Sequence, residues 1–185
     1  KGLQTFIVKE VRKKKSKKNL GLFEALQLST INATYLPKKN LQYIADISLV
    51  TCTKQEGINM KKKFFALFVA EVSSKVLHEN EIDKPLFHFL WNLKLKLAKA
   101  SEIDPNFAII FMIDLSKYMG FYPLIQEENT YFNLEIGEFT DNTDQTNYCL
   151  NKQNSNYFKT LLNKQKIIIP YTNRNQILLN LIDYY

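Results

Sequence analysis

The residues most able to do chemistry in this sequence are a cluster of cations near its start. Six Lys or Arg side chains stand within the seven residues RKKKSKK, and Lys9 lies shortly before them. Cations this closely spaced neutralise phosphates and release the counterions condensed on nucleic acid. The cluster favours a phosphate-binding site, and the alternative is a solvated loop that only keeps the protein soluble. The predicted contacts are Lys9, Arg12, Lys13, Lys14, Lys15, Lys17 and Lys18.

Two smaller lysine clusters extend the predicted DNA-binding surface. Lys61, Lys62 and Lys63 fall in the first turn of a predicted helix, where the helix dipole disfavours cations. A phosphate held at that helix start would explain their position, and a tolerated exposed face is the alternative. Lys38 and Lys39, in a predicted hairpin turn, are expected to join the same surface.

Patterns that indicate catalysis or metal binding are scarce. The two histidines, His78 and His88, fit no metal-ligand spacing, and the five glycines form no phosphate-binding loop. Cys52 and Cys149 are isolated in the sequence, so we expect neither a disulfide framework nor a zinc site.

Acidic residues that stand close together do not change this expectation. Asp114 precedes Lys117 by three residues on a predicted helix, which favours an internal ion pair over catalysis. Two glutamate pairs are interpreted as solvated charges rather than metal ligands: Glu127 with Glu128, and Glu135 with Glu138. We therefore predict a protein that is not an enzyme and that uses no metal and no cofactor.

The charge of the chain is unevenly distributed. The net charge of the 185 residues is +7, but residues 1–63 hold 14 Lys or Arg against four acids, while residues 64–185 hold 11 against 14. Only Arg12 and Arg174 are arginines, and lysine acts on phosphate as a point charge rather than as a reader of base edges. We expect binding to be backbone-directed and tolerant of sequence. The longest apolar run, 107–113, is far shorter than the roughly 20 residues of a membrane span.

The first third of the chain has the composition of β-structure. Segments 3–11, 26–36 and 41–50 are predicted strands, and the short turn PKKN between the last two predicts an antiparallel hairpin. Three strands do not close a barrel, so either a small barrel is incomplete here or the sheet leans on the following segment. Three aromatic residues lie in these strands, and core packing is favoured over base stacking for them: Phe6, Tyr35 and Tyr43.

The remainder of the chain has helical periodicity. Asn59 and Asp83 are predicted to cap helices over 59–78 and 84–97, and a nearly all-apolar helix over 106–119 ends at Gly120. Residues 131–140 predict a small β-ribbon, residues 142–156 a polar loop, and two more helices follow near 155–163 and 173–184. We predict a two-domain α+β protein, with a basic β-domain over 1–52 and a helical domain over 58–185.

The order of these segments resembles the RecO family of bacterial recombination-mediator and DNA repair proteins. No one motif is diagnostic, and the resemblance rests on an ordered set that covers most of the chain. Its segments are FIVKEVRKKKSKK (6–18), NLQYIADISL (40–49), KKFFALFVAEV (62–72), YMGFYP (118–123) and YFNLEIGEF (131–139).

The resemblance implies an N-terminal OB-fold β-barrel, whose first one or two strands would precede Lys1, followed by a helical domain that continues beyond Tyr185. It implies binding and annealing of single- and double-stranded DNA in recombinational repair. RecR and the acidic C-terminal tail of single-strand-binding protein would be partners in loading recombinase. Because residues 131–149 hold one cysteine, the four-cysteine zinc module of many family members is not expected.

The tail of single-strand-binding protein is expected to dock on the helical domain, with a set of lysines as candidates: Lys94, Lys96 and Lys99. The implied location is cytoplasmic and nucleoid-associated, without a membrane partner. The alternative function is a non-enzymatic protein-interaction scaffold whose basic loop is only solubilising.

Overall fold

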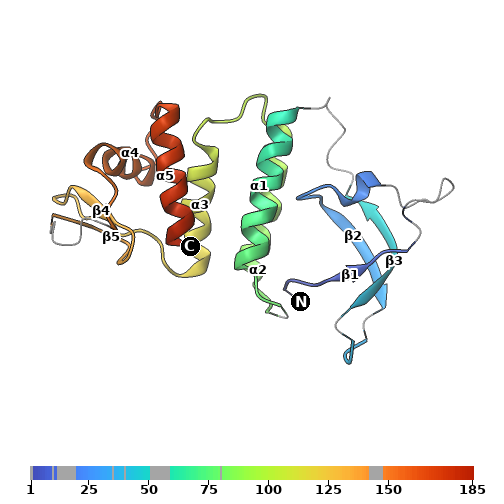
Figure 1. Cartoon of the computed structure of the whole chain (residues 1–185). Coiled ribbons are helices and arrows are strands. Elements are labelled where there is room, and N and C mark those ends of the chain that lie inside the picture. The colour runs from blue at the N-terminus through green and yellow to red at the C-terminus, as the bar shows by residue number, and fades with distance from the viewer. Residues whose placement is uncertain are drawn as a thin grey trace. The chain divides into compact units, whose positions relative to one another are not determined.

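The computed structural model of the chain describes residues 2–9, 11, 20–34, 36–39, 41–50, 59–79, 81–141 and 148–185. It forms two compact units, Lys1–Ile103 and Asp104–Tyr185, and each contains both helices and strands (Figure 1). The predicted α+β class is therefore confirmed. Within the described ranges, no helix has the length and apolarity needed to cross a membrane.

The first unit contains a three-stranded sheet with the order β1-β3-β2 (Figure 1). Its strands are β1 (Phe6–Ile7), β2 (Ser29–Thr34) and β3 (Gln42–Leu49). The predicted antiparallel hairpin of β2 and β3 is confirmed, and β1 joins the other side of β3 in parallel. In the described part of the chain this sheet is open, so the closed OB-fold barrel is not found there.

Two helices complete the first unit, α1 (Met60–Val76) and α2 (Lys84–Lys99). Both predicted caps are confirmed, since the Asn59 side chain accepts from the amide of the third helical residue of α1 and Asp83 does the same in α2. Val69 is fully buried in this unit. Phe64, on the same helix, is 63% exposed. The predicted domain boundary at 53–57 lies outside the described residues and stays a prediction. The helices α1 and α2 belong to the same compact unit as the sheet.

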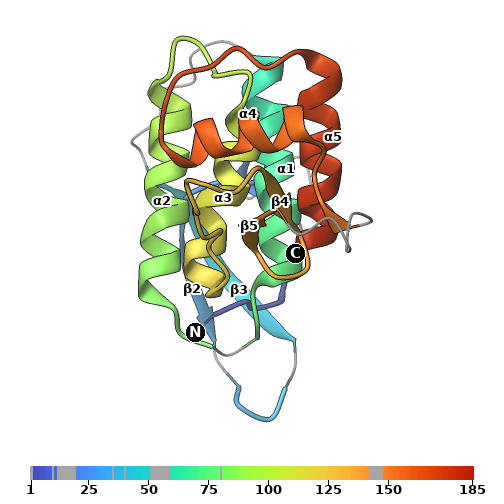
Figure 2. The same cartoon turned by 90° about the vertical axis from the view of Figure 1, so that its left-hand side faces the viewer.

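The second unit is built around α3 (Phe107–Met119), which has six buried residues, as predicted for the most buried helix. Around it lie the ribbon of β4 (Tyr131–Asn133) and β5 (Glu138–Thr140), with α4 (Lys152–Leu162) beside the ribbon and α5 (Tyr171–Tyr184) beside α3 (Figure 2). The ribbon and both C-terminal helices are confirmed. The helix α4 begins earlier than predicted because Asn151, placed in the expected loop, caps it through a 2.8 Å bond from the Asn154 amide.

The second unit also holds the larger apolar core. Among the described large side chains that are fully buried, all except Val69 belong to it. At its centre the Phe132 ring lies 4.6 Å from that of Phe158 and 5.2 Å from that of Phe139, which joins the ribbon to α4. Aromatic rings in such arrangements add stability beyond the area they bury.

We predict that Gly137→Ala destabilises the protein more than Gly120→Ala. Both glycines have positive φ, 71° and 85°, so alanine costs about 1 kcal/mol of backbone strain at each. A Cβ at Gly137 would lie 2.8 Å from the Tyr184 hydroxyl, which donates a 2.5 Å bond to the Phe121 carbonyl, whereas no described atom lies within 4 Å of a Cβ at Gly120. Losing that bond adds about 1 kcal/mol, measurable by urea unfolding. Equal losses for the two variants would contradict the prediction.

Candidate nucleic-acid interface

Lys9 and Tyr43 form a cation–aromatic pair on the sheet of the first unit. Lys9 follows β1, whose Ile7 pairs with Tyr43 in β3, and the Lys9 Nζ lies 4.8 Å from the centroid of the Tyr43 ring. Lys9 is exposed and the Tyr43 side chain is 39% exposed. The expectation that Tyr43 packs in the core is therefore wrong. The pair presents a cation for phosphate beside a ring on which a base can stack.

Small polar side chains continue this face along β2. Thr34 pairs with Tyr43 in register, and Asn32 and Thr30, two and four residues earlier, share its side of the strand. All three are exposed. A bulge between Asn32 and Ala33 keeps Asp46 and Ser48 of β3 opposite the same row. The result is an open face of hydroxyl and amide groups around Tyr43, in which Asp46 is the one carboxylate among these paired positions.

The turn between β2 and β3 is shaped by the buried side chain of Gln42. Its Nε2 donates to the carbonyls of Leu36 and Lys39 at 3.0 and 2.6 Å, and its Oε1 accepts from the Leu36 amide at 2.8 Å. One amide side chain therefore satisfies three backbone groups of Leu36 and Lys39 at the end of the hairpin. Lys38 and Lys39 are both exposed on it.

The three lysines at the start of α1 have different surroundings. The Lys62 Nζ donates a 2.8 Å bond to the carbonyl of Ala98, and the Lys63 Nζ lies 3.2 Å from Glu24 Oε1. Ala98 belongs to the last turn of α2, where carbonyls lack helical partners and a cation is favoured. The sequence suggested no structural reason for these lysines, and for Lys62 the structure provides one. Lys61 is exposed.

The largest predicted cluster, Arg12–Lys18, lies outside the described residues, so its role stays a prediction. The described candidates are therefore Lys9, Lys38, Lys39 and Lys61 to Lys63. The structure places Lys9 on the sheet face, Lys38 and Lys39 in the turn beyond it, and Lys62 and Lys63 on a helix.

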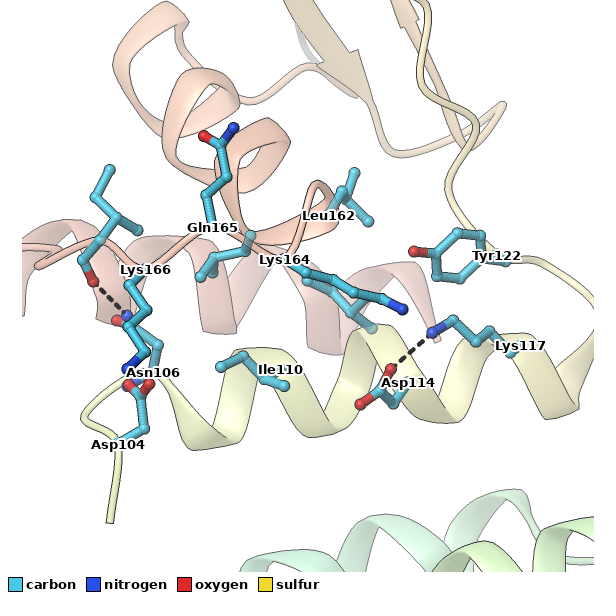
Figure 3. A pocket seen from close by; sticks show the side chains of 13 residues that line it. Asp104, Asn106, Ile110, Asp114, Lys117, Tyr122, Leu162, Lys164, Gln165 and Lys166 are labelled. Carbon is cyan, nitrogen blue, oxygen red and sulfur yellow. Dashed lines mark hydrogen bonds and ion pairs between the residues drawn. The ribbon is translucent and has the colours of Figure 1, made fainter. Parts of the chain in front are cut away.

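A second polar site, missed from the sequence, is a cavity of about 320 Å³ in the second unit (Figure 3). Its cations come from α3 and from the segment after α4, namely Lys117, Lys164 and Lys166. Its apolar lining consists of Ile110, Ile113, Leu161, Leu162 and Ile167. Only the tertiary structure brings these segments together, so the sequence carried no local signal for the site.

An ion pair marks one end of this cavity and a buried amide side chain marks the other. At one end the predicted ion pair is confirmed, with Lys117 Nζ 2.8 Å from Asp114 Oδ1 (Figure 3). Partial burial lowers the pKa of Lys117, but the hydrogen bond and charge of Asp114 outweigh it and raise the pKa overall. At the other end Asn106 is 2% exposed, and its Nδ2 donates to the Ile167 carbonyl at 2.9 Å. The buried Asn106 Oδ1 has no hydrogen-bond partner, which leaves an acceptor for a ligand or water.

The glutamate pair at 127–128 lies on a loop that is organised by an ammonium group. The Lys159 Nζ donates to the backbone carbonyls of Gln126, Glu127 and Asn129 at 3.1, 3.0 and 2.8 Å. Among the described residues no group of three or more His, Cys, Asp or Glu side chains is placed to hold a metal ion. Three backbone carbonyls of the loop therefore accept hydrogen bonds from one lysine, which holds the loop in place.

Comparison with known proteins gives one consistent result. Residues 59–178 match the family model described as "Recombination protein O C terminal". The chain is 29% identical over 192 residues to the DNA repair protein RecO of Flavobacterium johnsoniae and 27% identical over 191 residues to that of Christiangramia forsetii. Each alignment covers 100% of this chain and 79% of the relative. The DNA repair protein RecO of Bacteroides fragilis is 28% identical over 75% of this chain and 58% of its own length.

The structural role of Lys62 can be tested against its neighbour. We expect Lys62→Ala to lower the free energy of unfolding by about 1 kcal/mol, because it leaves the end of α2 without its charged donor. Lys61→Ala removes the same charge from an exposed position and should change stability by less than about 0.5 kcal/mol. Urea unfolding of the two variants measures the difference, and equal stabilities would show that the Lys62 bond does not stabilise the fold.

Proposed function

Because the chain belongs to the RecO family and is a DNA repair protein by that membership, we propose that it binds DNA through its first unit and acts as a recombination mediator. It binds and anneals single- and double-stranded DNA and works with RecR and single-strand-binding protein to load recombinase. It performs no covalent step and acts in the cytoplasm at the nucleoid. The observation that carries the proposal is the Lys9–Tyr43 pair on an exposed, polar sheet face.

Each part of this surface has a distinct task in the proposal. Tyr43 stacks on a base, and the hydroxyl and amide groups of β2 hydrogen-bond to sugar and phosphate. Lys38 and Lys39 in the turn, together with the cluster Arg12–Lys18, neutralise phosphates. Because nearly all of these cations are lysines, the binding tolerates any sequence, as annealing of arbitrary complementary strands requires.

We assign the sheet to an OB-fold, a barrel that binds single strands on its open face. The bulge in the β2–β3 pair supports this assignment, because bulges give strands the curvature that a barrel needs. The division into a β-domain over 1–52 and a helical domain over 58–185 is part of the same proposal. The family match, which begins at residue 59, supports that boundary.

The cavity of the second unit is the proposed docking site for the acidic tail of single-strand-binding protein. Lys164 and Lys166 lie beside an apolar floor, a combination that suits a peptide with both carboxylates and apolar side chains. The buried Asn106 Oδ1 can accept a hydrogen bond from a peptide N–H. Of the lysines considered from sequence, Lys96 and Lys99 are exposed on α2, and Lys94 is half-buried in the first unit.

A protein-interaction scaffold is the alternative function, and salt dependence separates the two. A DNA-binding protein shows an affinity that falls with salt, by a log–log slope of about 0.7 per phosphate contact on single strands. Fluorescence anisotropy with an oligonucleotide at two salt concentrations measures it. Failure of the purified protein to bind at both concentrations would favour the scaffold.

Substitution of Tyr43 tests the sheet face directly. We expect Tyr43→Leu to weaken binding to a single-stranded oligonucleotide by about fivefold or more, because stacking contributes about 1–3 kcal/mol per base. Tyr43→Phe keeps the ring and should bind as the original protein does. Neither variant changes charge, so the salt slope should stay the same. As a control, Tyr148→Leu removes an exposed ring from the second unit and should have no effect. Unchanged binding by Tyr43→Leu would contradict the assigned face.

Docking of the tail is tested with a labelled synthetic peptide of the acidic C-terminus of a bacterial single-strand-binding protein. We expect the double variant Lys164→Ala and Lys166→Ala to bind it about tenfold more weakly, since hydrogen bonds to charged groups contribute about 1.5–3 kcal/mol. The matched control removes two exposed lysines from α2, Lys96→Ala with Lys99→Ala, and should bind normally. Loss in the α2 variant alone would move the docking site to that helix.

A further inference from the structure

A pocket of about 410 Å³ lies within the first unit. It is formed where the segment that follows the short 3-10 helix Leu20–Phe23 meets α1 and α2. Its apolar lining is Phe23, Ala25, Ala66, Leu67, Leu97 and Ala98. Three lysines, Lys62, Lys63 and Lys94, stand among these apolar groups, so the pocket is positively charged and apolar at once.

This positive pocket already contains one anionic group of the chain itself. The carboxylate of Glu24 lies 3.2 Å from the Lys63 Nζ, and its charge also acts on Lys94. Burial lowers the pKa of Lys94, and Glu24 opposes that lowering, so the carboxylate helps to keep this ammonium charged. Lys62 adds a like charge nearby, although its own ammonium is bonded to the Ala98 carbonyl. Glu24 is therefore the internal counterion of the pocket.

The contact between Glu24 and Lys63 is one that a ligand can replace. The two side chains are 54% and 46% exposed, and an ion pair with this much solvent contact stabilises a fold only weakly. A phosphate carries its charge on several oxygens and can engage two ammonium groups together. The cost of displacing the carboxylate is accordingly small.

The location of the pocket favours a DNA phosphate as its ligand. Its cations are all lysines, which act on phosphate as point charges. The pocket also belongs to the unit that contains the strongly basic residues 1–63. Its apolar lining gives a nucleobase or sugar next to the bound phosphate a surface to pack against.

We propose that the Glu24 carboxylate stands in for a DNA phosphate between Lys63 and Lys94, and that DNA binding displaces it. This rests on the proposed DNA-binding function and adds a phosphate site on α1 and α2 to the strand face. Glu24 then lowers the affinity for DNA without touching it, because a strand must expel the carboxylate to reach the lysines. Glu24 therefore competes with the DNA phosphate for Lys63 and Lys94.

The test is the binding of a labelled single-stranded oligonucleotide by Glu24→Gln over a series of salt concentrations. With the competitor removed, affinity at low salt should rise about fivefold, the upper range for an exposed ion pair. The salt slope should stay close to that of the unchanged protein, because the same phosphate releases the counterions condensed on DNA whether or not Glu24 must first be displaced.

Glu71→Gln is the matched control, since it removes the same charge from an exposed position on α1. Its affinity should rise much less and its slope should stay unchanged. Adding Lys94→Met to Glu24→Gln should abolish the gain. Equal behaviour of the Glu24 and Glu71 variants overturns the proposal. So does a gain by Glu24→Gln for a labelled acidic peptide without a gain for DNA, which would assign the pocket to a protein partner.

The outcomes distinguish this proposal from the general one. If the unchanged protein and Glu71→Gln bind the oligonucleotide with a normal salt slope while Glu24→Gln adds nothing, only the displacement is wrong. If none of the proteins binds DNA at any salt concentration, both the proposed function and the displacement are wrong.

Discussion

The organisation of the first unit depends on how an excess of lysine charge is accommodated on a small surface. Residues 1–63 hold ten more cations than acids, and like charges repel unless each finds a partner or water. The structure uses three different solutions, an aromatic ring for Lys9, a helix end for Lys62 and a carboxylate for Lys63. Lys38, Lys39 and Lys61 are exposed instead. A ring carries no net charge, so Lys9 stays available to a polyanion together with the exposed lysines, while Lys62 and Lys63 are engaged within the fold.

The second unit contains most of the buried core, whereas the first unit has the more exposed surface. The second unit buries nearly all of the large, fully enclosed side chains, including the cluster around Phe132. The first unit exposes much of its sheet, with Ile31, Tyr43 and Leu49 each more than a third exposed. A sheet with an uncovered face has surface to offer a ligand, and a unit with a well-packed core can hold a cavity of fixed shape. This division suits the two contacts proposed above, one with a DNA strand and one with a short peptide.

Features set by neighbouring residues were predictable from the sequence, and features set by distant ones were not. The caps at Asn59, Asp83 and Gly120, the hairpin and the buried helix α3 all follow from local residue types, and the structure confirms them. Alternation in β3 showed that one face must be buried but not which, so Tyr43 was assigned to the core although it lies outside. The bond from Lys62 to Ala98 spans 36 residues, and Glu24 meets Lys63 across 39. No pattern within a helix or strand reports such pairs.

Internal counterions give a physical account of how a recombination mediator can bind DNA and still release it. A lysine surface with no internal partners would gain affinity with every phosphate and hold a strand too long to pass it on. Each contact that a lysine makes within the protein lowers the gain in affinity by the free energy needed to break that contact. The Lys62 ammonium is bonded to a carbonyl at a helix end, and breaking that bond would cost stability. The Lys63 ammonium is paired with a half-exposed carboxylate, and breaking that pair costs little. In the proposed function, the affinity for DNA is set by which lysines form contacts within the fold and how strong those contacts are, so that a position such as Glu24 tunes DNA binding without contacting DNA.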